Sequence, residues 1–332
     1  MMLILLCAID LRAQYKSEKD ATIPLEHFYI ERQKGGLRQL LSKLHFGLST
    51  GYGRTTFKHE LDGFGIVQQP DSVPMIFSSG VAVRYSNWFN GVNSNAGAVQ
   101  PGSFTVSSDT TTLGFKAKSF SIPLKATIHV EFNRYRIGGG YSYEFVHLNT
   151  FNPISYGSDV RGFEPQANNF FMRKYFAMLG GMVYRYYEYA LVVDANIGGY
   201  KLGKKFDNSV IRKGIYFNLG VTAEREMSEY LRLFVRPSYE FKNYKLSLPE
   251  GSSSITHRLN AMYINVGLTY RFPELRRCFL KDCHAQINHA HGNREYRSRR
   301  HPFWKKQNPH YGENYPTLLK YKGKNKKKLS PY

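Results

Sequence analysis

Residues 120–132, FSIPLKATIHVEF, alternate apolar and mostly polar side chains over their whole length. Phe, Ile, Leu, Ala, Ile, Val and Phe stand at the even-numbered positions. Because successive side chains of a β-strand point to opposite faces, the segment predicts a strand with one apolar and one polar face. It is longer than the ~5–6 residues usual for soluble strands. A strand of this length and pattern is typical of a barrel that crosses a membrane.

Similar alternation recurs through most of the chain. Residues 170–186 alternate least clearly, so the direction of their side chains is left open. The predicted strands cover residues 44 to about 57, 113–132, 135–145, 170–186, 189–197, 215–224, 231–242 and 262–272.

Short and long connections follow one another between these strands. Tight turns are predicted near Asn133 and Arg134, near Tyr187 and Glu188, and at 227–229, whereas 60–112, 146–169, 198–213 and 245–256 are long and polar. Outer-membrane barrels place short turns in the periplasm and long loops outside, and lipid does not tolerate an open sheet edge.

The predicted fold class is therefore all-β. We expect an eight-stranded antiparallel up-and-down transmembrane β-barrel over residues 44–272, in contact with outer-membrane lipid and with both termini in the periplasm. A soluble β-sandwich also alternates and is the alternative left open.

Composition agrees with this prediction. The 332 residues include 25 Tyr, 23 Phe and 29 Gly, the aromatic and glycine enrichment expected of barrel strands and their interfacial girdles. Beyond the extreme N-terminus, nothing approaches the ~18 consecutive apolar residues of a membrane helix.

The N-terminal residues precede the predicted barrel. Residues 1–13 are predicted to be a signal peptide, with an apolar core and a small residue, Ala13, at the cleavage position. A lipoprotein anchored at Cys7 and a buried N-terminal strand are the alternatives. Residues 14–43 are predicted to be a periplasmic lead-in, with a short amphipathic helix near Leu37, Leu40 and Leu41.

The segment 44–272 resembles the small eight-stranded outer-membrane barrels, of which the OmpA barrel and OmpX are members. The resemblance includes Tyr270, Arg271 and Phe272, which are similar to the aromatic-ended last strand that barrel-assembly machinery recognises. It implies architecture only, since that group covers many functions. This chain departs from the pattern by continuing for 60 residues after Phe272. Barrels of the PorT type, linked to type IX secretion, are another group that the chain resembles.

Charged residues lie on the predicted inward face. Eight strands leave an interior about wide enough to be filled by side chains, and buried charges need partners or water. We therefore predict an interior plugged by ion pairs rather than a conducting channel. The predicted network comprises Lys125, Glu131, Arg136, Glu144, Asp194, Glu224, Arg232, Arg236, Glu240 and Arg271.

No catalytic, cofactor-binding or metal-binding residue is assigned. The histidines before the tail are scattered, and none stands in a compact His-x-Ser arrangement on one strand. His59 and His147 are expected in solvated loops near the outer rim. Enzymatic activity is therefore not favoured, although it is not decided.

Residues 273–332 are predicted to be a basic, largely irregular periplasmic tail. From Glu274 onward they hold fifteen Lys and Arg residues against four acidic ones, a net charge of +11, interleaved with aromatic residues. This composition favours binding to an anionic partner, either an envelope protein complex or peptidoglycan, over a flexible end without a partner, which is the alternative left open. The periplasmic location argues against nucleic acid. The candidate binding residues are Arg294, Arg297, Arg299, Arg300, Trp304, Lys305, Lys306, Lys326, Lys327 and Lys328.

Two cysteines lie at the start of the tail. Cys278 and Cys283 are predicted to form a disulfide loop in the oxidising periplasm. A metal site with His284, His289 and His291 is a less favoured alternative, because the spacing matches no standard zinc finger. Two cysteines that form neither a disulfide nor a metal site are the other alternative.

Two functional hypotheses follow. The first is a non-enzymatic barrel whose tail docks on an envelope complex or the cell wall, as a structural, secretion or assembly accessory. The second is an outer-membrane enzyme or small-solute transporter that acts through the barrel, with an ancillary tail.

Overall fold

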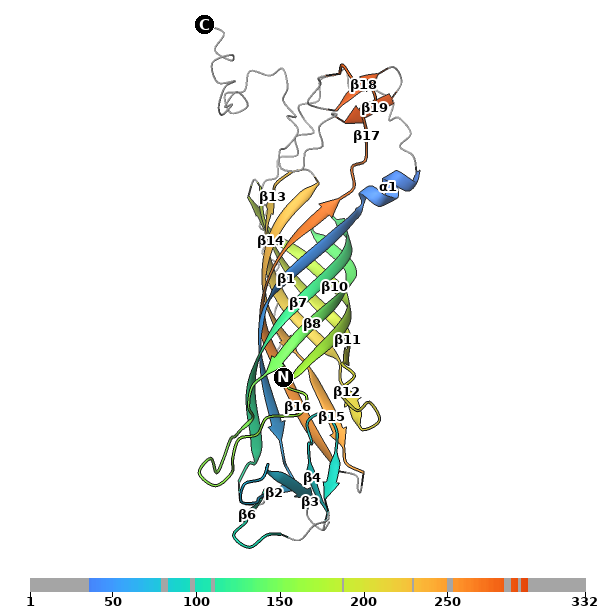
Figure 1. The fold of residues 1–332 in the computed structure, drawn as a ribbon. Helices are drawn as coiled ribbons and strands as arrows, with labels where there is room; N and C mark the ends of the chain where they lie inside the picture. The colour runs from blue at the N-terminus through green and yellow to red at the C-terminus, as the bar shows by residue number, and fades with distance from the viewer. Residues whose placement is uncertain are drawn as a thin grey trace, which may run out of the picture.

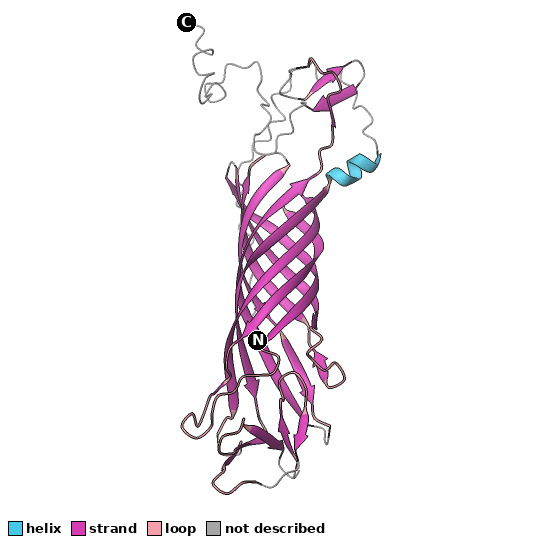
Figure 2. Cartoon of the chain, viewed as in Figure 1, coloured by secondary structure: helices cyan, strands magenta, loops and turns pink. Residues whose placement is uncertain are grey.

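The computed structural model describes residues 36–78, 83–95, 99–108, 111–186, 188–228, 230–249, 253–283, 288–291 and 294–297. These residues form one short helix, α1 (Gly36–Ser42), and otherwise strands and loops (Figure 2). No helix in this part of the chain is long and apolar enough to cross a membrane. The predicted signal peptide, residues 14–35 of the predicted lead-in and the tail after Arg297 lie outside the described residues.

Eight long strands make up most of the structure, and they overlap the eight segments that the alternation predicts. They are β1 (Leu44–Glu60), β7 (Gly114–Phe132), β8 (Tyr135–Leu148), β10 (Asn169–Tyr186), β11 (Tyr189–Leu202), β13 (Tyr216–Glu226), β14 (Leu231–Phe241) and β16 (Ser254–Arg271).

The hydrogen-bonded path through these strands closes on itself. Its order is β1-β7-β8-β10-β11-β13-β14-β16, every pairing is antiparallel, and β16 pairs with β1 from His45↔Arg271 to Glu60↔Thr256. The result is the tilted, closed sheet of Figure 1. The prediction of an antiparallel all-β fold is therefore confirmed.

The sheet contains more strands than the eight predicted. Three short strands extend it to eleven: β9 (Asn152–Pro153), β12 (Ile211–Lys213) and β15 (Asn243–Ser247). β15 continues the edge of β16 beyond the end of β14, so it lengthens the wall at the long-loop end.

Turn chemistry fixes the register at the short-turn end. The link between β7 and β8 has only Asn133 and Arg134, and Asn133 has a φ of +52°, which Asn tolerates better than most residues.

Inside the sheet, the β1–β7 register is interrupted beside Pro123 and the β13–β14 register beside Pro237. Proline has no N–H to donate to a neighbouring strand, which explains both gaps.

Additional structure lies beyond both ends of the closed sheet (Figure 1). At the long-loop end a second sheet has the order β5-β4-β3-β2-β6, built from β2 (Phe64–Gln68), β3 (Met75–Ser78), β4 (Arg84–Ser86), β5 (Asn93–Asn95) and β6 (Phe104–Ser107). The interpretation of residues 60–112 as a polar loop was therefore wrong. Ile66 of β2 and Ile76 of β3, for example, are buried and belong to the hydrophobic cluster at this end of the molecule.

The short-turn end carries α1 and a third sheet, which we call the tail sheet. It has the order β17-β19-β18, formed by β17 (Arg276–Arg277), β18 (His289–His291) and β19 (Arg294–Arg297). The described beginning of the tail therefore contains three short strands, whereas most of the segment predicted to be largely irregular lies outside the described residues. A hydrogen bond from Arg38 Nε to the Pro273 carbonyl, at 3.1 Å, connects α1 with the start of the tail.

Candidate functional site

The outer surface of the closed sheet presents large apolar side chains on all eight long strands. Leu124 is 54% exposed while its neighbour Lys125, which points inward, is only 8% exposed. We call these outward side chains the apolar belt: Leu48, Tyr52, Ile122, Leu124, Ile128, Phe132, Tyr135, Ile137, Tyr141, Tyr143, Phe171, Tyr175, Leu179, Val183, Tyr184, Tyr186, Tyr189, Leu191, Val193, Ile197, Leu219, Val221, Leu233, Val235, Tyr239, Phe241, Met262, Ile264, Val266 and Leu268.

The belt has different borders at its two ends. At the short-turn end it finishes in exposed tyrosines, among them Tyr135, Tyr186 and Tyr189. Beyond it at the long-loop end, exposed outward positions carry cations such as Lys118 and Arg258. Aromatic residues at an apolar–aqueous border are typical of barrel girdles.

Charged side chains fill the interior at the short-turn end. Arg136 donates to Glu131 through Nε at 2.7 Å and to Glu224 through Nη2 at 2.6 Å. Arg232 donates to Glu131 through Nη1 at 2.6 Å. Four of the predicted interior residues, from β7, β8, β13 and β14, thus form one network across the interior.

A second group lies between Asp194 of β11 and Arg236 of β14. Arg236 Nε donates to Asp194 Oδ1 at 2.7 Å, and its Nη2 donates to Asn218 at 2.7 Å. The Thr222 hydroxyl donates to the other oxygen of Asp194 at 2.6 Å. Both ions therefore have partners in an interior where an unpaired charge is costly.

The third group is centred on Lys174 of β10, which the sequence analysis did not identify. Its Nζ lies 2.5 Å from Glu144 and 2.6 Å from Glu240. Glu240 also pairs with Lys242 at 2.5 Å, and the Tyr263 hydroxyl donates to Glu144. Lys174 thereby links the carboxylate of Glu144 on β8 with that of Glu240 on β14, two strands that are not neighbours in the closed sheet.

Lys125 and Arg271, two residues of the predicted network, lie outside the three ion-paired groups. Lys125 is buried, and its Nζ lies 5.4 Å from the centre of the Phe176 ring, where a cation meets an aromatic face. Arg271 lies at the short-turn mouth, half-buried, and pairs with Glu274 at 3.9 Å. It therefore borders the interior rather than filling it.

Little space remains between the charged groups. A cavity of about 50 Å³ is lined by Lys125, Asp194, Asn196, Arg236 and Asn265, among others. A water molecule needs roughly 10–15 Å³ of such volume, so the cavity can hold a few waters.

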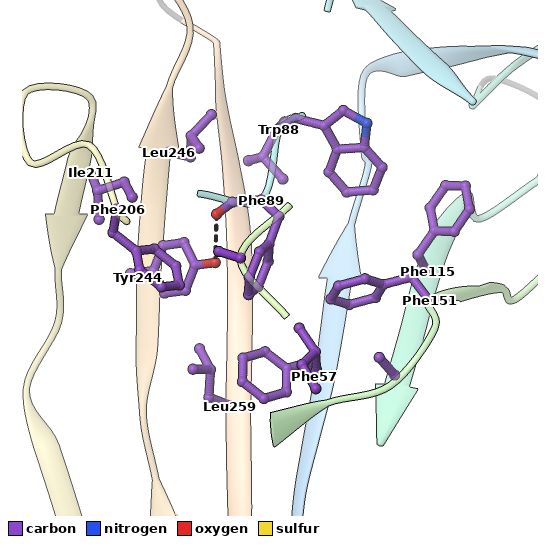
Figure 3. Packing of buried hydrophobic residues seen from close by; sticks show 14 of the residues in the cluster. Phe57, Trp88, Phe89, Phe115, Phe151, Phe206, Ile211, Tyr244, Leu246 and Leu259 are labelled. Carbon is purple, nitrogen blue, oxygen red and sulfur yellow. Dashed lines mark hydrogen bonds between the residues drawn. The ribbon is translucent and has the colours of Figure 1, made fainter. Parts of the chain in front are cut away.

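Buried aromatic side chains pack together at the long-loop end, and Figure 3 shows part of this cluster. Trp88 and Phe89, from the segment between β4 and β5, pack against side chains of the closed sheet: the Trp88 ring centre lies 5.2 Å from that of Phe115 on β7, and the Phe89 ring centre lies 5.8 Å from that of Phe57 on β1. Phe89 also lies 5.3 Å from the ring of Phe151, in the connection between β8 and β9. We call this cluster the aromatic plug; its rings are Phe57, His59, Trp88, Phe89, Phe115, Phe151, Phe163, Phe170, Phe206, Tyr244 and His257.

His59 was expected in a solvated loop, and that prediction was wrong. Its side chain is fully buried in the aromatic plug, with its ring 4.3 Å from that of His257. His147 is partly buried and its Nδ1 lies 2.6 Å from Asn169 Oδ1. Among the described residues, neither histidine has an acid or a nucleophile arranged beside it as a catalytic set.

Two groups of side chains in the described residues could hold a metal ion. One is His45, His129 and Glu131 at the short-turn mouth, and the other is Cys278, Cys283, His289 and His291 at the tail sheet. Cys278 and Cys283 are not joined to each other by a disulfide in the structure, so the predicted disulfide is not present there. Each sulfur instead lies against an imidazole nitrogen.

The candidate tail residues divide into two sets. Arg294 is exposed, whereas Arg297 is buried. Arg299, Arg300, Trp304, Lys305, Lys306, Lys326, Lys327 and Lys328 lie outside the described residues.

No protein-family model and no curated protein matches the sequence. Among solved structures, the chain is similar to the outer membrane protease OmpT from Escherichia coli, at 13% identity over 69% of this chain and 96% of that chain, with a TM-score of 0.33. It is also similar to the outer membrane protein OprG from Pseudomonas aeruginosa, at 8% identity over 69% and 95%, with a TM-score of 0.35.

A third similar structure is the translocator domain of the autotransporter NalP from Neisseria meningitidis, at 12% identity over 68% of this chain and 88% of that chain, with a TM-score of 0.24. At these identities and scores no family is assigned to the chain. The resemblance to the OmpA-barrel, OmpX and PorT groups stays a prediction.

Proposed function

We propose that this protein is a non-conducting β-barrel of the bacterial outer membrane that anchors a basic periplasmic docking segment. The apolar belt carries this proposal. A soluble protein rarely exposes large apolar side chains over a continuous surface, whereas a barrel wall in lipid requires them.

Two interior features support an anchoring role over transport. The ion-paired groups around Arg136, Arg236 and Lys174 occupy the interior from the short-turn mouth inward, and the aromatic plug fills the long-loop end. Moving a solute through this barrel would require breaking buried ion pairs and displacing the plug.

The short-turn end is the side we assign to the periplasm. Short turns face the periplasm in known outer-membrane barrels, and the tail sheet lies at this end (Figure 1). The tail's net charge of +11 would then face peptidoglycan carboxylates or acidic surfaces of an envelope protein complex. The proposed partner is therefore an anionic component of the envelope.

Membrane placement is tested by separating inner and outer membranes and running the protein, unheated and heated, in detergent gels. We expect it in the outer membrane with a mobility that changes on heating, as folded barrels show. Recovery from the soluble fraction would overturn the barrel proposal.

Docking is tested separately by affinity purification from solubilised envelopes. One variant changes Arg299, Arg300, Lys305, Lys306, Lys326, Lys327 and Lys328 to Gln; a matched control changes Lys116 and Lys118, at the other end of the barrel, to Gln. We expect the first variant alone to lose the co-purifying envelope complex or peptidoglycan. Equal recovery of partners by both variants would refute docking by the tail, without affecting the barrel proposal.

A further inference from the structure

Four potential zinc ligands converge at the tail sheet. Cys278 Sγ lies 3.3 Å from His291 Nε2, and Cys283 Sγ lies 3.1 Å from His289 Nε2. One ligand atom from each of the four residues falls within 4.8 Å of every other. Zinc bonds of ~2.3 Å to sulfur and ~2.0 Å to nitrogen in a tetrahedron place ligand atoms about 3.3–3.8 Å apart. The two sulfur–nitrogen separations lie at or slightly below the short end of this range, and the 4.8 Å limit on the others exceeds it by about 1–1.5 Å, so modest side-chain adjustments would let the four residues enclose one ion.

The backbone explains why these residues meet. His289 and His291 stand two positions apart on β18, so their side chains leave the same face of the strand. Cys278 follows β17 directly, and its N–H donates to the Arg297 carbonyl of β19 at 3.1 Å. β19 pairs with β17 on one side and with β18 on the other. It therefore holds Cys278, which follows β17, close to the two histidines of β18.

The tail sheet is small, and besides its backbone pairing it has ring contacts among Phe279, His291 and Tyr296. Its strands contain two, three and four residues, and the register places Arg277 beside Arg297. Domains below ~40 residues usually need a metal or a disulfide because they bury too little apolar surface. The side chains of Cys278 and Arg297 are nevertheless buried.

We propose that Cys278, Cys283, His289 and His291 bind one Zn²⁺ ion as a closed structural site that folds the beginning of the tail. Two thiolates and two neutral imidazoles complete a four-coordinate zinc shell and leave no position for substrate. Binding releases the two thiol protons to solvent and leaves the metal and its two thiolates with no net charge. The thiolates would also be unavailable for a disulfide.

The other candidate group is a poorer zinc site. Glu131 already accepts from Arg136 at 2.7 Å and from Arg232 at 2.6 Å. A divalent cation bound there would lie against two guanidinium groups, and that repulsion opposes binding. A substitution of His129 therefore serves as a control, because it should leave the zinc content of the chain unchanged.

Metal content of the purified full chain, measured by mass spectrometry after dialysis, tests the proposal. We expect one zinc per chain, retained in H147A and H129Q and lost in C278S/H291A. Substituted Co²⁺ should give thiolate charge-transfer absorption and the strong visible bands of a tetrahedral ion. Zinc that remains in C278S/H291A, a stoichiometric metal other than zinc, or a Cys278–Cys283 disulfide in protein that takes up no Zn²⁺ after reduction would overturn it.

A second measurement separates folding of the tail sheet from folding of the barrel. With zinc bound, trypsin should cleave slowly after Arg276, Arg277 and Arg294; chelation or C278S/H291A should speed cleavage by at least about tenfold, while heat-modifiability of the barrel is unchanged. Cleavage that does not respond to chelation of zinc-loaded protein would refute the structural role.

Discussion

The hydroxyl of Tyr244 donates a hydrogen bond to the carbonyl oxygen of Phe89, at 2.9 Å. Tyr244 belongs to β15, and Phe89 to the segment between β4 and β5, so the contact joins the closed sheet to the structure beyond it (Figure 3). The Phe89 side chain is fully buried against Phe57, Phe151 and Phe206. The plug is therefore held by both backbone and ring contacts.

Removing the Phe89 ring should loosen the aromatic plug. We expect F89A to lower the free energy of unfolding in detergent by about 3–5 kcal/mol, the cost of an aromatic-sized cavity. Acrylamide quenching of Trp88, measured in a W304F background that leaves one tryptophan, should increase at the same time. V73A, at an exposed loop position, is the control and should change neither quantity. Equal effects of the two substitutions would contradict the packing of Phe89 in the aromatic plug.

Acid should also weaken the plug. His59 and His257 lie beyond the apolar belt, their ring nitrogens have no hydrogen-bond partner, and their rings face Trp88, Phe89, Phe151 and Tyr244. Burial lowers the pKa of His257 to about 3 and holds the pKa of His59 well below 6.5. A state in which the plug has opened and exposed these histidines therefore binds protons at a higher pH than the packed plug does. The packed plug loses stability relative to that opened state as the pH falls below about 6.5.

The free energy that favours the packed plug over the opened state should fall by about 1.4 kcal/mol per pH unit for each histidine, until the pH reaches the pKa of that histidine in the packed plug. Trp88 quenching should thus rise between about pH 7 and about pH 4.5, the range in which an unperturbed histidine gains its proton. H59F/H257F should flatten this dependence. A double variant with the same pH profile as the native chain would rule the two histidines out as the cause.

Lys174 should be the most sensitive interior position. K174M leaves Glu144 and Glu240 facing each other without their shared cation, and we expect a loss of about 3–5 kcal/mol in the free energy of unfolding. K201M, which removes an exposed lysine from the neighbouring strand, should cost less than about 1 kcal/mol. Adding E240Q to K174M should recover part of the loss, and the absence of any recovery would argue against the ion pair as its origin.

Alternation predicts strands well where the two faces meet different media. In residues 120–132 the apolar side chains face outward and Lys125 and His129 face inward, so the pattern reports both the strand and its orientation. The same reasoning places Asp194, Glu224 and Arg236 inside before any coordinates are known. Their particular partners depend on which strands close the sheet, and local sequence does not contain that information.

The pattern fails where the interior is itself apolar. On β10 the inward side chains Phe170, Met172 and Phe176 are as apolar as the outward ones, so Lys174 between them does not stand out. Trp88 and Phe89 have no periodic context, because long-range packing rather than strand periodicity buries them. The cysteine and histidine cluster likewise depends on the register of β17, β18 and β19, which spacing alone does not reveal.

Gly220 provides space for the Arg236 guanidinium. A Cβ atom added at Gly220 would lie 2.6 Å from Cζ and Nη2 of Arg236, so the guanidinium would have to move away from Asp194 and Asn218. Because those hydrogen bonds involve buried charges, G220A should lower the free energy of unfolding by roughly 1–3 kcal/mol. At Gly181 an added Cβ meets only a Tyr135 ring carbon at 3.9 Å, so G181A is the matched control and should not destabilise the fold. Urea unfolding of both variants in the same detergent measures the difference, and equal stabilities would show that Arg236 can pair with Asp194 from another position.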